Sequence, residues 1–133
     1  MKVLLTLYGD ETIKGIFSPE KIERTIAAWD EFGQAARDAG VFLACEGLEG
    51  SDTATTVRME RGRRHVTDGP FIETKEQLGG VVLLEVRDLD EAMEWAGRTP
   101  WNFDGCSTEI RPVLDYDAYA AQAANATEEA AAS

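Results

Sequence analysis

The chain has 133 residues, of which 25 are acidic and 13 are basic, so its formal net charge at neutral pH is −12. This length predicts one domain that is large enough to bury an apolar core. The negative charge disfavours nucleic acid and anionic membrane surfaces as partners, because both would repel the chain at long range. No stretch approaches the about 20 apolar residues of a membrane span, and no secretory signal pattern opens the chain. A cytoplasmic protein is therefore expected.

One short segment is basic. Its members are Arg58, Arg61, Arg63, Arg64 and the single histidine, His65. The segment straddles a predicted hairpin turn at residues 61–62. We interpret it as a solvated hairpin that balances acidic neighbours, and an anion-binding site is the alternative. His65 itself is expected to be structural or solvated.

The two cysteines, Cys45 and Cys106, lie far apart in the chain and lack CxxC spacing. Neither a zinc site nor a redox dithiol is therefore predicted, and no metal or other cofactor is expected. We interpret both cysteines as reduced, mostly buried small hydrophobic residues.

The first third of the chain predicts a strand followed by a helix. Residues 3–8 are β-prone and nearly all apolar, as in a central strand that is covered on both faces. A polar loop is expected over residues 9–15. Ser18-Pro19-Glu20 is then typical of a helix start, with a hydroxyl at the N-cap and proline at the first helical position. Apolar residues recur at helical spacing from there to a stop at Gly40.

The remainder predicts further strands and one more helix. The strands are expected at residues 41–48, 53–59, 80–86 and 107–114, and residues 63–67 are expected to pair back as a hairpin extension. The segment from Asp88 to Glu91 looks like the capping box of a short second helix. The order strand, helix, two or three strands, helix, strand matches the ferredoxin-like split βαβ arrangement of an α+β fold.

In that arrangement both helices cover the same face of the sheet, and the strand periodicity describes the other face. Val82 and Leu84 point to one side of their strand, whereas Leu83 and Glu85 point to the other. On the last strand Glu109 and Arg111 likewise point to the same side, so that face of the strand is charged. A half-apolar, charge-bearing face is left uncovered, and a second subunit is its economical cover. A homodimer is therefore predicted.

The composition changes at Asp115, after which no basic residue occurs. Alanine-rich sequence favours helix, but an isolated segment of this length is marginal in water. We expect a frayed tail, or a helix that forms only on docking through Tyr116 and Tyr119. The predicted organisation is one domain over residues 1–114 and an acidic tail over residues 115–133.

A stretch between the hairpin and the next strand has no helical or strand periodicity. It begins Asp68-Gly69-Pro70-Phe71 and continues through residues 73–76 to a glycine pair at residues 79–80. Asp68 is expected to hydrogen-bond backbone groups ahead of it, and glycine and proline fix the turn. Phe71 is expected to be a hydrophobic anchor. The glycine pair allows another backbone or a ligand to approach the next strand closely.

This stretch closely resembles the signature of the YCII-related, or DGPF-domain, family, and the resemblance extends over residues 1 to 114. The resemblance implies a dimeric α+β barrel, in which two ferredoxin-like sheets pack face to face. It implies little about function: some members look like partners encoded beside alternative sigma factors, and some barrel relatives act on small ring compounds by proton transfer or elimination. In one branch a histidine and an aspartate near the first strand form the site. Tyr8 and Asp10 occupy that neighbourhood here, and no histidine is present there. The dyad is therefore not carried over to this chain.

Proton transfer without a cofactor needs a carboxylate or imidazole in a dry pocket and a group that stabilises developing negative charge. The candidate catalytic set is Asp68, Glu73 and Arg111. Tyr8, Phe71 and Lys75 are candidate substrate-binding residues. The alternative is that Asp68 caps its own turn, that Glu73 and Lys75 are solvated, and that Arg111 pairs with Glu109 or Glu85.

Two function classes follow. One is a cofactor-free isomerase or lyase that acts on a small organic molecule between the sheets. The other is a non-catalytic dimeric module that binds a metabolite or a regulatory protein, for example in a pathway linked to a sigma factor.

Overall fold

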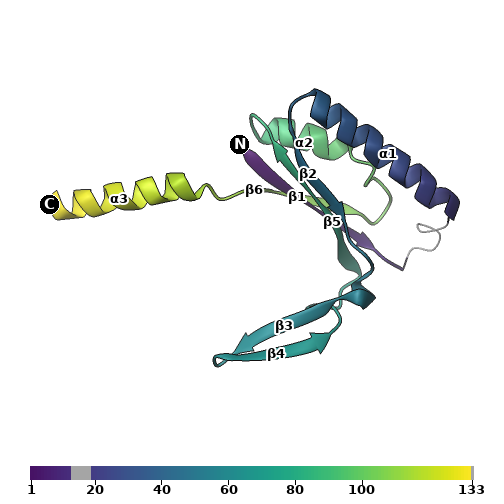
Figure 1. Cartoon of the computed structure of the whole chain (residues 1–133), viewed down its shortest axis with the longest axis horizontal. Coiled ribbons are helices and arrows are strands. Elements are labelled where there is room, and N and C mark those ends of the chain that lie inside the picture. The colour runs from purple at the N-terminus through teal and green to yellow at the C-terminus, as the bar shows by residue number, and fades with distance from the viewer. Residues whose placement is uncertain (13–18, 133) are drawn as a thin grey trace.

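The computed structural model describes residues 1–12 and 19–132 (Figure 1). The elements in chain order are β1 (Lys2–Asp10), α1 (Pro19–Asp38), β2 (Phe42–Gly47), a 3₁₀ turn η1 (Ser51–Thr53), β3 (Thr55–Glu60), β4 (Arg63–Asp68), β5 (Glu76–Glu85), α2 (Leu89–Arg98), β6 (Ser107–Pro112) and α3 (Tyr116–Ala132). In the part of the chain that the structure describes, no helix is long and apolar enough to cross a membrane.

The main sheet has four antiparallel strands in the order β2-β5-β1-β6. Helices α1 and α2 lie together on one side of it (Figure 1). This is the ferredoxin-like α+β arrangement that the element order predicts. The strands β3 and β4 pair only with each other, in a separate two-stranded sheet. The hairpin expected at residues 63–67 is therefore confirmed, but β3 adds no strand to the main sheet.

Alternate residues of the central strands form the core. Val3 and Leu5 of β1 and Val82 and Leu84 of β5 are completely buried. They pack against the apolar sides of the two helices, which contribute Phe32, Ala36, Ala92 and Trp95. The prediction that Val82 and Leu84 share the covered face is thus confirmed. The expectation that β1 is covered on both faces is not met within one chain, because its intervening residues are only partly buried.

The helix ends follow the capping rules. The N–H of Val41 donates to the Ala36 carbonyl and that of Gly40 to the Arg37 carbonyl, which is the Schellman pattern. Gly40 takes a φ of 74° there, so the predicted stop is confirmed. The Asp88 carboxylate accepts from the Glu91 N–H at 2.9 Å and caps α2. Helix α1 begins at proline as predicted, whereas the proposed Ser18 cap lies outside the described residues.

The facing ends of β1 and β5 both extend beyond the sequence prediction. β1 continues to Asp10, beyond the predicted start of a polar loop at Gly9, and β5 begins at Glu76 rather than at residue 80. The reason is mutual pairing, because Gly9 lies opposite Gln77 and Asp10 opposite Glu76. The ladder skips Gly79, which forms a bulge.

The β3–β4 hairpin and helix α3 extend away from the sheet on the side opposite α1 and α2 (Figure 1). The β3–β4 hairpin turns at Arg61 and Gly62, whose φ angles of 50° and 77° suit a type I′ turn. All described residues of α3 are exposed. The tail is thus helical without the expected docking contacts of Tyr116 and Tyr119, and the Asp115 carboxylate caps it by accepting from the Ala118 N–H.

Gly69 is the backbone position on which the hairpin base depends. It has a φ of 101°, and its N–H donates to the Ala54 carbonyl at 2.7 Å. A Cβ at this position meets no atom within 4 Å, so an alanine would be strained by its backbone alone. We expect Gly69→Ala to lower the free energy of unfolding by about 1 to 3 kcal/mol.

Gly47→Ala is the matched control, because a Cβ at Gly47 also meets nothing and its φ is not positive. Its change should stay within about 0.5 kcal/mol. Urea unfolding of both variants measures the difference, and equal effects would contradict the role assigned to Gly69.

Candidate functional site

The site is built around the loop of residues 69–75, which joins β4 to β5 and is called the motif loop below. Its backbone is tied to the hairpin. The Thr56 hydroxyl donates to the Gly69 carbonyl at 2.7 Å, and Nη2 of Arg58 donates to the Phe71 carbonyl at 2.8 Å. Gln77 Nε2 donates to two further loop carbonyls, those of residues 72 and 74. The loop is therefore held through its backbone, which leaves its side chains available for contacts.

A cavity of about 840 Å³ lies between the motif loop, the base of the hairpin and the adjacent end of the sheet; we call it the loop cavity. The apolar side chains that line it include Tyr8, Leu48, Val57, Phe71 and Leu78. Glu49, Glu76 and Gln77 add polar groups. Its size and its mainly apolar lining are those of small-molecule sites.

A smaller cavity of about 370 Å³ shares part of the same loop, since Pro70 and Thr74 line both. Most of its lining residues carry polar or charged groups, among them Glu73 and Lys75. Glu11, another lining residue, is fixed by accepting hydrogen bonds from the amide and hydroxyl groups of a serine in η1. The motif loop thus lies between two cavities, one with aromatic and aliphatic side chains and one with more charged side chains.

Asp10 is the buried charge of this region, with 7% of its surface exposed. Its carboxylate accepts hydrogen bonds from the hydroxyl and the N–H of Thr12, and Lys75 Nζ lies 3.6 Å from it. The Thr12 hydroxyl, the Thr12 amide and the Lys75 charge hold the pKa of Asp10 below its ordinary value, against the opposing effect of desolvation. Asp10 is therefore a stabilised carboxylate that ties the end of β1 to the motif loop.

The glycine pair allows close approach to the strand, as the sequence predicts, but by a backbone at Gly80 and by a side chain at Gly79. A Cβ at Gly79 would lie 2.6 Å from the indole ring of Trp101, and one at Gly80 would lie 2.8 Å from the carbonyl oxygen of Glu46. Trp101 Nε1 also donates to the Tyr8 carbonyl at 2.9 Å. The close approach fixes the sheet end that carries Tyr8 into the loop cavity.

The structure places the predicted site residues in different surroundings. Tyr8 and Phe71 line the loop cavity, and Glu73 and Lys75 line the smaller cavity. Lys75 is more than a solvated cation, because it pairs with Asp10.

Asp68 and Arg111 line neither cavity. Asp68 ends β4 opposite Thr55, and within residues 1–12 and 19–132 its side chain has no hydrogen bond or ion pair, so the expected capping bond is not seen. Arg111 lies opposite Leu4 on β6, with its Nε 3.9 Å from a carboxylate oxygen of Glu109, as the alternative interpretation anticipates. One chain therefore does not gather the three candidate catalytic residues around one cavity.

Asp10 and Trp101 are residues of the site that were not predicted from the sequence. The signal for Asp10 was the Asp10-Glu11-Thr12 segment, because an aspartate readily accepts hydrogen bonds from groups two residues ahead. For Trp101 the signal was indirect, in the glycines that it requires at positions 9 and 79.

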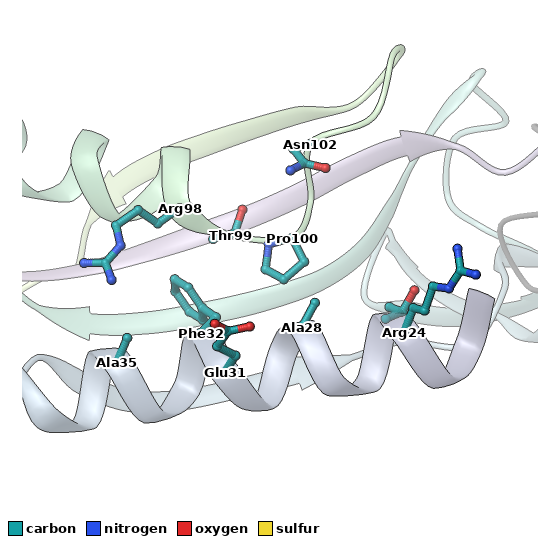
Figure 2. Close-up of a pocket in the computed structure, with 10 residues that line it drawn as sticks. Arg24, Ala28, Glu31, Phe32, Ala35, Arg98, Thr99, Pro100 and Asn102 are labelled. Atoms are coloured by element: carbon teal, nitrogen blue, oxygen red, sulfur yellow. The ribbon is translucent and has the colours of Figure 1, made fainter. Parts of the chain in front are cut away.

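A groove of about 520 Å³ lies elsewhere, between α1 and the segment after α2. Figure 2 shows Arg24 and Arg98 at its opposite ends, with Glu31 between them. The Arg98 guanidinium lies over the Trp95 ring at 4.2 Å, which fixes it as a packing group. No residue of the motif loop lines this groove.

The cysteines are free and half-buried, as the sequence predicts in part. Burial raises the pKa of the Cys45 thiol, and the neighbouring Glu46 charge adds to this effect. This thiol is therefore poorly reactive. Among the residues that the structure describes, no three His, Cys, Asp or Glu side chains are grouped to hold a metal ion.

The fold and the motif loop together define a ferredoxin-like α+β domain with a cavity of ligand size at one end of its sheet. The chain belongs to the YCII-related domain family, which matches residues 1–117. It is also 34% identical over 110 residues to an uncharacterized protein of Rhizobium meliloti (strain 1021), across 82% of this chain and 89% of that protein. The family resemblance identified from the residues around the motif is confirmed.

The lowered pKa of Asp10 predicts a specific acid dependence of stability. A depressed carboxyl pKa stabilises the fold fully above the ordinary value of 3.8, and this contribution is lost as the pH falls through the pKa of the folded state. Asp10→Asn removes the charge, so we expect its free energy of unfolding to fall less than that of the parent between about pH 5 and about pH 2. Urea unfolding across this range measures it.

Asp68→Asn is the control, since that carboxylate has no partner among the described residues. It should follow the parent at every pH. Parallel curves for the parent and Asp10→Asn would show that the Thr12 and Lys75 contacts do not stabilise the fold.

Proposed function

We propose that this protein is a homodimer that binds a small organic molecule in the loop cavity. The observation that carries the proposal is that the family motif itself walls a cavity of about 840 Å³ with Phe71 directed to it from the loop and Tyr8 from β1. Small-molecule sites combine such an apolar lining with a few convergent polar groups. The polar groups here include Gln77, the carboxylates of Glu49 and Glu76, and serine and threonine hydroxyls.

The charges of the lining indicate the class of ligand. Among the residues that the structure describes, two carboxylates and no basic side chain line the loop cavity. An anionic ligand would meet like charge there, in a chain whose net charge is already −12. The aromatic rings of Tyr8 and Phe71 offer flat apolar contact surfaces. The proposed ligand is therefore a neutral or cationic molecule with an apolar or ring-shaped body.

The homodimer is supported by the open face of the sheet. Leu4 and Thr6 of β1 and Val81 and Leu83 of β5 point away from the helices, and the single chain leaves them only partly buried. The charged side chains around them are those of Lys2, Glu85, Glu109 and Arg111. An apolar centre with a rim of both charges is suited to a self-complementary interface.

Cofactor-free proton transfer at the motif loop is a second candidate, of the isomerase or lyase type. It is favoured by Glu73, whose carboxylate is exposed in the smaller cavity near Lys75 and has no partner within the described ranges. Asp10 is unsuited to the role of base, because its lowered pKa makes it a weak proton acceptor. Asp68 and Arg111 lie outside the lining of both cavities, so within one chain they are not placed to contribute to this reaction.

Ligand binding is tested with a thermal-shift screen of neutral and cationic metabolites, followed by calorimetry on the compounds that stabilise the protein. Phe71 is 67% exposed in the free chain, so its ring is available to a ligand. We expect Phe71→Ala to raise the dissociation constant about tenfold, which corresponds to about 1.4 kcal/mol. Leu89→Ala, at an exposed leucine of α2, should change nothing.

The same ligand separates the two candidate functions. If the protein only binds, the parent should leave the ligand unchanged and Glu73→Gln should bind it equally well. If Glu73 transfers a proton, the parent should convert the ligand, whereas Glu73→Gln should bind it without converting it. A ligand whose affinity is indifferent to Phe71→Ala and to Tyr8→Ala would place the site elsewhere.

The dimer is tested by light scattering at micromolar concentration, where we expect a mass twice the 14.6 kDa of one chain. Leu83→Lys places a charge in the middle of the open face and should weaken association at least about tenfold. Met93→Lys is the control, because Met93 is an exposed apolar residue of α2 on the other side of the sheet. A monomer mass for the parent would reject the dimer.

A further inference from the structure

Two segments of the structure have little contact with the rest of the chain. The hairpin arm comprises residues 55–68, and the tail arm comprises residues 115–132. All residues of the two hairpin strands are exposed except Thr56, which is half-buried, and all described residues of α3 are exposed. A two-stranded hairpin and an isolated helix of this length are each marginal in water. Both arms therefore gain stability from any surface that covers them.

The arms carry apolar groups that suit such a contact. Val57 and Val66 lie opposite each other in the hairpin, and Met59 follows on the same face. All three are more than half exposed. Tyr116 and Tyr119, one turn apart at the start of α3, are also exposed.

The arms also carry opposite charge. The hairpin arm holds four arginines against Glu60 and Asp68, so its formal charge is +2. The tail arm holds Asp115, Asp117, Glu128 and Glu129 and no basic residue, so its formal charge is −4. The chain as a whole has a net charge of −12, so the hairpin arm is a basic surface on an acidic protein. It therefore attracts acidic segments of another copy of the chain.

Within one chain the arms leave from opposite ends of the sheet. The hairpin is connected through the Gly47 end of β2 and the Glu76 end of β5. The tail follows Pro112, which lies opposite Val3 at the other end. Both arms nevertheless extend on the open side of the sheet (Figure 1). A two-fold axis perpendicular to the strands reverses the strand direction, so each hairpin arm then lies at the end where the tail arm of the other copy begins.

We propose that the hairpin arm of each copy binds the tail arm of the other copy, so that the dimer is held by two equivalent arm contacts in addition to the open faces. The proposal rests on the homodimer proposed above. In this contact the arginines of the hairpin arm pair with carboxylates of the tail arm, and the valines and Met59 contact its tyrosines. Val57 also lines the loop cavity, so this contact borders the ligand site.

The test is a charge swap, measured as the dimer dissociation constant by analytical ultracentrifugation at low salt. Arg63→Glu with Arg64→Glu reverses the hairpin tip, and Glu128→Lys with Glu129→Lys reverses the tail. We expect each pair alone to weaken the dimer about tenfold or more. The four substitutions in one chain should restore the constant to within about threefold of the parent, because both contacts then regain opposite charges.

Two controls separate this contact from general effects of charge. Asp90→Lys with Glu94→Lys adds the same charge as the tail variant but on α2, and it should leave the constant unchanged. Removal of residues from Tyr116 onward should weaken the dimer while the circular dichroism of the core persists, because no described residue of α3 is buried. Hydrogen exchange should show protection of the α3 amides in the parent at concentrations where the dimer is formed.

The outcomes distinguish the two proposals. A parent that is monomeric at every concentration overturns the homodimer and the arm contact together. A dimer whose constant is unchanged by either charge reversal and by removal of the tail, with α3 amides exchanging as in a free helix, overturns the arm contact and leaves the dimer in place. Weakening by single reversals without recovery in the fourfold variant also contradicts it.

Discussion

The close approach of Trp101 and β2 to the glycine pair at the start of β5 is the contact on which the rest of the site depends. Side chains at Gly79 and Gly80 would lie 2.6 Å from the indole ring and 2.8 Å from a β2 carbonyl oxygen, distances that atoms do not adopt. Their absence allows the indole N–H to reach the Tyr8 carbonyl and allows β5 to bulge opposite Tyr8. The sheet end is thereby shaped into one wall of the loop cavity.

The motif loop completes the cavity in a manner suited to binding. Its carbonyls accept hydrogen bonds from Thr56, Arg58 and Gln77, whereas Phe71 and Glu73 project without such restraints. A backbone held in this way loses little further conformational entropy when a ligand binds, which favours affinity. Because the positive φ of the glycine at the loop's start is needed for this path, the motif is explained first by backbone geometry and then by the side chains it presents.

Charge is distributed unevenly over the molecule, and this distribution bears on both the proposed ligand and the proposed contact between the arms. Acidic residues outnumber basic residues in the chain, and two carboxylates line the loop cavity. For this reason the proposed ligand is neutral or cationic. The hairpin is the basic exception, and it stands on the same side of the sheet as the acidic α3 (Figure 1). In a symmetric pair each complementary contact occurs twice, so even modest attractions between arms contribute substantially to association.

The amino-acid sequence by itself determined the local elements and the family. Helical spacing, the Gly40 stop, the Asp88 cap and the alternation along β5 are set by nearest neighbours, and the structure reproduces them. The motif was long enough to identify the YCII-related family. Tertiary structure alone decided that the β3–β4 hairpin stands apart from the sheet, that Lys75 pairs with Asp10, and that Arg111 lies away from the motif loop. These are contacts between residues distant in sequence, and their partners are chosen by the packing of whole elements, which leaves no periodic trace in the chain.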